Sequence, residues 1–330
     1  MNDFQPFDTY VTPRELRSDR RQLTAIALAV TLMYAITLAV QLIVVVLVKL
    51  FVPWIQGEGW YVIVASNGPM YVVAMPLAVL CYRISVAQPP KETKKMSVLA
   101  FLGLIPICFA LTYVGNIIGT VVNGVIESVT GEPVVNDLQE LAKNMPLWCS
   151  FLFMGILAPI FEEIFYRKLV IDRLLRFGEL PAVLISGILF GLIHANFSQF
   201  FYAAMLGTVF GYIYIRTGRL RYTVALHMIL NIVGGVYTNE ILKMINLDLM
   251  AEKGVEYLMQ NPIPFLLLLG YYLFIGVCFV AAPIALVLLW KQIRFRKSEQ
   301  PLSARDWVDV AVKNPAVWIF AAVIVLMFVF

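Results

Sequence analysis

The sequence predicts an all-α fold, a polytopic bundle of about eight or nine transmembrane helices, and three observations support it. The 330 residues are 61% hydrophobic and 14% charged, whereas soluble domains are about half apolar and about one quarter charged. Several apolar runs reach roughly 20 residues, which as a helix crosses a hydrocarbon core of ~30 Å. Lipid offers no hydrogen-bond partner to an open backbone, so the spanning segments must be helices.

Nine apolar stretches have the length and composition of membrane helices. The helices are expected near residues 24–52, 60–82, 97–122, 147–168, 180–195, 199–217, 221–238, 264–290 and 315–330. The first stretch is too long, and begins too late, for the apolar region of a cleaved signal peptide, so it is expected to be retained. The last stretch is short, and it is expected to lie shallow or to be packed less firmly.

The charged residues between these stretches predict one orientation in the membrane. Residues 1–21 hold eight charges and are expected to form a cytoplasmic tail. Cytoplasmic loops carry an excess of Lys and Arg, which predicts a multi-pass protein of the cell membrane with its N-terminus in the cytoplasm. Basic clusters recur at 83–96, 168–179, 216–221 and 291–314. These clusters lie beside apolar runs and not on one long polar face, so the lipid bilayer is an expected partner and nucleic acid is not.

Three of the apolar segments contain polar side chains that are costly in a membrane. An ionisable side chain costs at least about 2.5–3.5 kcal/mol at the centre of a bilayer, so such residues indicate function. Both histidines of the chain belong to this set. The set consists of Glu162, Glu163 and Arg167 in the first segment, His194 in the second, four residues after Phe190, and His227 and Asn231 in the third.

Helix geometry separates the two glutamates. Glu163 and Arg167 are four residues apart and share a face, so they can pair and hold the helix end in place. Glu162 points about 100° away and lacks that partner, which leaves it free to act as a general base. His227 and Asn231 also share a face, and two neutral donors on one face suit an oxyanion site.

The depth of His194 in the membrane is left open by the sequence. Glu162 and His227 each lie six residues from a cytoplasmic cation, or about 9 Å along a helix. His194 follows Glu179 by fifteen residues, which would be about 22 Å along a straight helix. Tilt, a deeper start to this helix, or a dip of the loop 195–199 could bring His194 to the depth of Glu162.

The three motifs together resemble the CPBP family of intramembrane proteases, which includes type II CAAX prenyl endopeptidases and their prokaryotic relatives. The resemblance covers about residues 147–238 and extends through Gly207, Gly211, Tyr214, Thr217, Gly218 and Leu220. It implies that Glu162 and His194 activate a water, and that His227 and Asn231 stabilise the oxyanion. Glu163, Arg167 and Phe190 would support these residues.

The expected function is therefore hydrolysis of a peptide bond in a membrane-associated peptide or protein, with no covalent intermediate and no cofactor. The chain is expected to be one integral membrane domain, 1–330, with 147–238 as its catalytic core. The small residues Gly207 and Gly211 are expected to let their helix pack closely against its neighbours.

Two alternatives stay open. In the first, Glu162, His194 and His227 bind a divalent metal such as zinc, although the sequence has no local pair of ligands and Asn231 is a poor fourth ligand. In the second, the chain is a non-catalytic membrane scaffold, or a proton-coupled transporter that uses these residues as a relay. A transporter would favour matching halves with broken helices, and the sequence shows no such internal symmetry.

Overall fold

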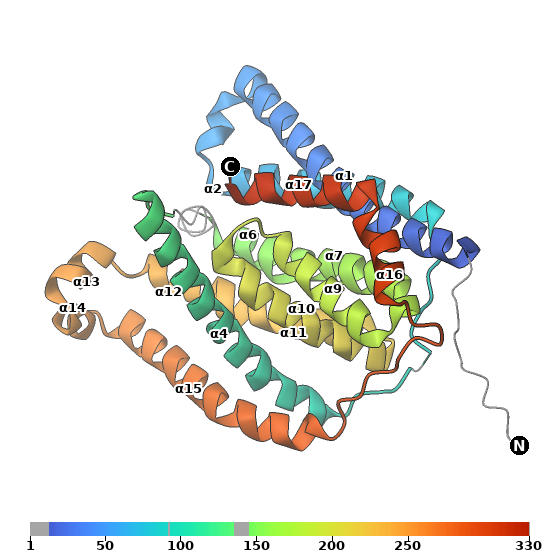
Figure 1. The fold of residues 1–330 in the computed structure, drawn as a ribbon. Helices are drawn as coiled ribbons and strands as arrows, with labels where there is room; N and C mark the ends of the chain where they lie inside the picture. Colours follow the sequence, from blue (N-terminus) through green and yellow to red (C-terminus); the bar gives the residue numbers. More distant parts are fainter. Residues whose placement is uncertain (1–12, 92, 135–144, 330) are drawn as a thin grey trace, which may run out of the picture.

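The computed structural model describes residues 13–91, 93–134 and 145–329, and every regular element within them is helical (Figure 1). The predicted all-α class is confirmed. Each of the nine expected helices is present, although several consist of consecutive helical segments with different turns.

The N-terminal part is a long helix folded back against a broken one. Helix α1 (Pro13–Phe51) is followed by the short turn η1 (Pro53–Gly57) and then by four consecutive segments. These segments are α2 (Gly59–Gly68), η2 (Pro69–Ala74), α3 (Met75–Ala78) and η3 (Val79–Ile84). Proline has no backbone N–H and crowds the preceding turn, and Pro69 stands where the path changes from α to π turns. Helix α1 packs along η2, η3 and α3.

The first expected helix was placed too late in the sequence. It begins at Pro13 and not near residue 24, so residues 13–21 of the expected tail are helical. Residues 1–12 lie outside the described residues. Within α1, Asp19 and Gln22 are buried. The pattern of apolar residues could not reveal this, because both side chains are polar.

Helix α4 (Val98–Thr130) is longer than expected and ends beyond residue 122. Ser97 caps its start by accepting a hydrogen bond from the N–H of Ala100, and Gly131 ends it with a left-handed φ of 76°. Helix α15 (Pro262–Trp290) runs beside α4 on one side of the molecule (Figure 1).

The central helices begin with a path of mixed turns. It comprises α6 (Leu147–Cys149), η4 (Ser150–Leu157), α7 (Ala158–Glu163), η5 (Ile164–Ile171), α8 (Asp172–Leu174) and η6 (Leu175–Phe177). Both η4 and η5 are π-helical, a geometry that is often found at functional sites. Five further segments follow: α9 (Glu179–Leu192), α10 (Phe197–Thr217), α11 (Leu220–Leu230), η7 (Asn231–Tyr237) and α12 (Thr238–Lys243).

Helices α9 and α10 pack closely because glycines face each other. A Cβ atom on Gly207 would lie 2.9 Å from the Cα of Gly187, and one on Gly191 would lie 2.7 Å from the carbonyl oxygen of Phe200. Gly211 faces Ile171 and Val183. The packing role expected for Gly207 and Gly211 is confirmed.

The C-terminal part returns to the first helix. It contains α13 (Leu247–Lys253), α14 (Val255–Gln260), α15, α16 (Ala304–Trp307), η8 (Val308–Val312) and α17 (Pro315–Val329). Helix α17 lies along α1 (Figure 1). The guanidinium of Arg20 donates to the carbonyl of Asp309, and the amide of Asn314 donates to the Thr24 hydroxyl.

The count of eight or nine membrane segments is not confirmed. Within the described residues, five helices are long and apolar enough to cross a membrane, or six if the pair 304–312 and 315–328, bent by 67°, forms one span. Helix α9 has only 14 residues, too few for a full span. Several helices are nevertheless long and apolar enough to span a bilayer, so the fold is that of a polytopic membrane protein.

Candidate active site

A buried ion pair fixes the first motif. Glu163 and Arg167 are both fully buried, and the Arg167 Nε donates to Glu163 Oε2 at 2.9 Å. The Arg167 Nη1 donates to the hydroxyl of Ser186 on α9 at 2.9 Å, and that hydroxyl donates to the carbonyl of Tyr166. The pairing predicted from the four-residue spacing is confirmed. It ties the end of α7 to α9.

Glu162 has different partners from its neighbour. Its side chain is buried, and its Oε1 accepts a hydrogen bond from the hydroxyl of Tyr71 at 2.9 Å. Its Oε2 lies 3.7 Å from Nε2 of His227. Glu162 thus makes no ion pair with Arg167, as helix geometry predicted, but two other helical segments reach it.

His227 lies between the two carboxylates. Its Nδ1 is 3.3 Å from Glu163 Oε1, and its Nε2 faces Glu162. A neutral imidazole has one N–H and one lone pair, whereas an imidazolium has two N–H groups. In either form, at least one ring nitrogen of His227 can direct an N–H to a neighbouring carboxylate oxygen. The sequence indicated only that His227 shares a face with Asn231, and it gave no sign of this bridge.

His194 lies in the turn between α9 and α10, because α9 ends at Leu192 and the expected helix 180–195 is shorter than predicted. Its Nδ1 contacts the carbonyl oxygen of Phe190 at 3.1 Å. Ala195 has a positive φ of 52°, which turns the chain. The Asn196 side chain donates to the carbonyl of His194 and accepts from the N–H of Gln199, so it holds the turn and caps α10.

Phe190 lies between the two imidazoles. Its ring makes edge contacts with His194 and with His227, each with centroids 5.5 Å apart. The guanidinium of Arg167 lies 5.0 Å from the same ring. In the part of the chain that the structure describes, Glu162 and His194 share no hydrogen bond or ion pair. Phe190 thus brings the second motif against the first and third.

Asn231 begins η7, and its side chain is half-buried. Its Nδ2 donates to the carbonyl oxygen of Met154 on η4 at 2.9 Å. A side-chain amide has two N–H donors, so one remains for another acceptor. Asn231 therefore joins η7 to η4 and can still donate once.

No metal site can be assigned among the described residues, since none of their His, Cys, Asp and Glu side chains form a group of three or more that could hold an ion. The expected absence of a cofactor and the metal-dependent alternative both stay predictions.

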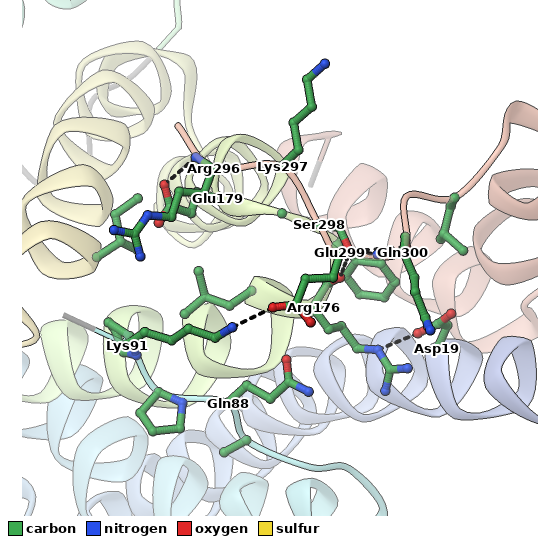
Figure 2. Close-up of a pocket in the computed structure, with 18 of the residues that line it drawn as sticks. Asp19, Gln88, Lys91, Arg176, Glu179, Arg296, Lys297, Ser298, Glu299 and Gln300 are labelled. Atoms are coloured by element: carbon green, nitrogen blue, oxygen red, sulfur yellow. Dashed lines mark hydrogen bonds and ion pairs between the residues drawn. The ribbon is translucent and has the colours of Figure 1, made fainter. Parts of the chain in front are cut away.

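The structure also contains a polar cavity of about 830 Å³, and Figure 2 shows residues that line it. It is formed by the start of α1, residues 87–91, residues 175–179, the end of α10 and residues 296–302. Arg176 pairs with Asp19, Arg216 with Glu179, and Lys91 with Glu299. These pairs join segments that are 37 to 208 residues apart in sequence, and none of the predicted site residues lines the cavity.

Comparisons with known proteins bear on the central helices. Residues 144–233 match the family model described as type II CAAX prenyl endopeptidase Rce1-like, and this segment contains all seven predicted site residues. Over 93 residues, 28% of this chain, the sequence is 29% identical to YdiL of Bacillus subtilis (strain 168), a candidate membrane peptidase. Over 112 residues, 34% of this chain, it is 26% identical to the UPF0177 protein YxdF of Lactococcus lactis subsp. lactis (strain IL1403).

The aligned stretches span 37% of YdiL and 60% of YxdF. No solved structure matches the chain significantly. The resemblance found in the three motifs is confirmed for the central segment, and it supports a membrane peptidase.

Proposed function

Starting from the similarity of residues 144–233 to Rce1-like CAAX endopeptidases, we propose that the chain is an intramembrane endopeptidase. It cleaves a peptide bond in a membrane-associated peptide or protein with a water activated by Glu162. One observation carries the proposal: two adjacent glutamates have opposite surroundings. Glu163 is held by Arg167 through two hydrogen bonds. Among the described residues, Glu162 has no cationic Arg or Lys partner, and its polar contacts are the Tyr71 hydroxyl and the His227 imidazole that it shares with Glu163.

The proposed reaction needs one base and a set of donors. Glu162 takes a proton from water, and the resulting hydroxide attacks the peptide carbonyl carbon. The developing oxyanion accepts hydrogen bonds from His227 and from the remaining N–H of Asn231. Protonated Glu162 then gives its proton to the leaving nitrogen as the C–N bond breaks. His194, whose Nδ1 contacts the Phe190 carbonyl, uses Nε2 to orient the water.

The contacts of His227 extend this scheme. Because one of its nitrogens faces Glu162 and the other faces Glu163, His227 can stabilise the charge on Glu162 before reaction and turn to the oxyanion during it. The ion pair of Glu163 with Arg167 then keeps a negative charge next to the imidazole throughout.

The basic clusters support an orientation with the N-terminus in the cytoplasm. In that orientation, the polar cavity and its loops lie on the cytoplasmic side. The family description names a prenylated CAAX substrate. The helices outside residues 144–233 carry no motif for such a substrate, so the proposed substrate class is a membrane-associated peptide.

The function is tested with the purified full chain in liposomes and a panel of lipid-anchored peptides, some of them prenylated. Wild type should release product, and Glu162→Gln should lower turnover by about 10²–10⁴-fold or more, the usual effect of losing a general base. Glu299→Gln, on an exposed loop, is the matched control and should retain full turnover. Failure of the wild type to cleave any member would favour the scaffold or transporter.

Metal dependence is tested on the same preparation. We expect turnover to persist after strong chelation and the purified protein to contain no stoichiometric zinc. Loss of turnover that one added metal restores would instead favour the metal-dependent alternative, with Glu162, His194 and His227 as ligands.

A further inference from the structure

The base of the proposed reaction is held by a residue from outside the segment that resembles known peptidases. Tyr71 belongs to η2, more than 70 residues before the start of the matched segment at residue 144. Its side chain is buried, and its hydroxyl donates to Glu162 Oε1 at 2.9 Å. The ring of Tyr71 stacks on Phe161, with centroids 5.1 Å apart and planes 11° from parallel. The stack fixes the ring, and the ring fixes the hydroxyl.

The segment that carries Tyr71 is itself anchored to the central helices. Helix α1 packs along η2, and the hydroxyl of Tyr34 on α1 donates to the carbonyl of Leu192 at 3.1 Å. Leu192 is the last residue of α9, directly before the turn that bears His194. Two tyrosine hydroxyls of the N-terminal part thus reach the two halves of the proposed site.

We propose that Tyr71 is a positioning residue for Glu162, an inference that rests on the proposed function. Its hydroxyl holds Oε1, so that Oε2 is the oxygen directed to His227 and to the reacting water. A carboxylate that is free to rotate would present either oxygen, and proximity catalysis depends on one fixed geometry. A hydrogen bond donated to a carboxylate also favours the ionised form that a base requires.

Other ionisable groups also interact electrostatically with the Glu162 carboxylate. These groups are the same in the wild type and in variants that change only Tyr71. The groups within electrostatic range of Glu162 are Tyr34, Glu163, Tyr166, Arg167, Tyr202 and His227. Among the described residues only Tyr71 donates a hydrogen bond to Glu162. Removal of one hydroxyl therefore isolates the proposed contact.

The test is Tyr71→Phe in the full chain, with Tyr82→Phe as the matched control. Phenylalanine keeps the ring that stacks on Phe161 and removes only the donor. Tyr82 is buried in the same apolar cluster as Tyr71, and its hydroxyl has no hydrogen-bond partner among the described residues. We expect Tyr71→Phe to lower kcat on the order of tenfold or more with KM nearly unchanged, because hydrogen bonds to charged groups are the stronger ones. The acidic limb of the pH–rate profile should also move to higher pH.

Three results would overturn the proposal. One is a Tyr71→Phe enzyme with the kcat and pH profile of the wild type. Another is a fall in kcat that is equal at every pH and matched by Tyr82→Phe, which would indicate a packing role. The third is an unshifted carboxyl band in the infrared difference spectrum of Tyr71→Phe. That band is identified by its loss in Glu162→Gln. That band needs no turnover, so an inactive wild type would refute the proposed function and still leave this contact testable.

Discussion

Arg167 is fully buried, and its side chain contacts both polar groups and aromatic rings of the site. Its guanidinium donates to Glu163 and to Ser186 and lies against the rings of Phe190 and Phe210. Removing one partner of a buried ion pair leaves the other charge without compensation, which typically costs about 3–5 kcal/mol. The site is therefore expected to lose stability when either Glu163 or Arg167 is replaced alone.

The first prediction is a double-mutant cycle on this pair. Arg167→Met should lower the free energy of unfolding by about 3–5 kcal/mol, since Glu163 then stays buried without its partner. The double variant Glu163→Gln, Arg167→Met should recover part of that loss because no charge is left to desolvate. Thermal unfolding in detergent measures both. Equal loss in the single and the double variant would mean that the ion pair is not what holds α7 to α9.

The second prediction separates the adjacent glutamates. Glu163→Gln should reduce stability and part of the turnover, whereas Glu162→Gln should abolish turnover with little change in thermal stability and substrate binding. Both variants are assayed for turnover and for unfolding temperature. If Glu163→Gln were folded but inactive while Glu162→Gln kept nearly normal turnover, the base would be Glu163 and not Glu162.

At this scale, the sequence could predict contacts within one helix and not contacts between helices. The pair of Glu163 with Arg167 follows from a spacing of four residues. The contact of His227 with Glu163 joins residues 64 apart in the chain, and that of Tyr71 with Glu162 joins residues 91 apart. Tyrosine is common in membrane helices as an interfacial or core residue, so nothing in the sequence marked Tyr71 as a partner.

Among the elements, the pair α9 and α10 decides where the His194 turn lies. A Cβ on Gly191 would meet the backbone oxygen of Phe200 at 2.7 Å, and backbone cannot move as a side-chain tip can. Close approach at this point lets the chain leave α9 at Leu192 and re-enter α10 at Phe197 within one short turn.

The third prediction follows from this contact. Gly191→Ala should destabilise the protein by about 1–3 kcal/mol, the typical cost of overpacking, and should lower turnover because the His194 turn moves. Gly276→Ala in α15 is the control, since a Cβ there meets no atom within 4 Å. It should leave turnover unchanged. Retention of full turnover and stability by Gly191→Ala would show that the two helices tolerate separation.

The sequence predicted where helices occur because apolar runs of the right length have few alternatives in lipid. It did not predict the π turns of η4, η5 and η7, since such turns arise from packing and proline placement and not from a periodic pattern. Asn231 lies at the first residue of η7, and its bond to Met154 on η4 joins two of these segments.

For the whole molecule, the fourth prediction concerns orientation. Cysteines introduced at Lys253 and at Lys297, both exposed, in a variant whose four existing cysteines are replaced, should react differently with a membrane-impermeant thiol reagent in intact cells. Lys253→Cys should be labelled from outside, and Lys297→Cys only after permeabilisation, because basic loops face the cytoplasm. The opposite pattern would invert the proposed topology and move the polar cavity to the outer side.

The fifth prediction concerns the loops around the polar cavity. Lys91 holds Glu299 through a hydrogen bond of 2.7 Å, and this contact lowers the pKa of the Glu299 carboxyl from its usual value. A carboxyl with a lowered pKa in the folded state stabilises that state above its unfolded pKa, and the contribution is lost as pH falls through the folded value. Both side chains are exposed, so salt screens the effect.

Glu299→Gln should therefore lower the unfolding temperature slightly at neutral pH and low ionic strength. The difference from wild type should vanish in acid and in high salt. A difference that persists under acid conditions would show that the glutamate acts through packing and not through its charge.

The pairing of α17 with α1 also has a consequence for how the protein is made. Arg20 and Thr24 have partners at Asp309 and Asn314, residues that are added to the chain about 290 positions later. A ribosome that adds ~5–20 residues per second needs roughly 15–60 s to cover that distance. During that interval the face of α1 that α17 will cover has no partner from this chain, and α1 is the helix on which η2 and Tyr71 rest. Cleavage activity should accordingly appear only after synthesis has passed residue 315, which a time course of product release during cell-free translation into liposomes would measure.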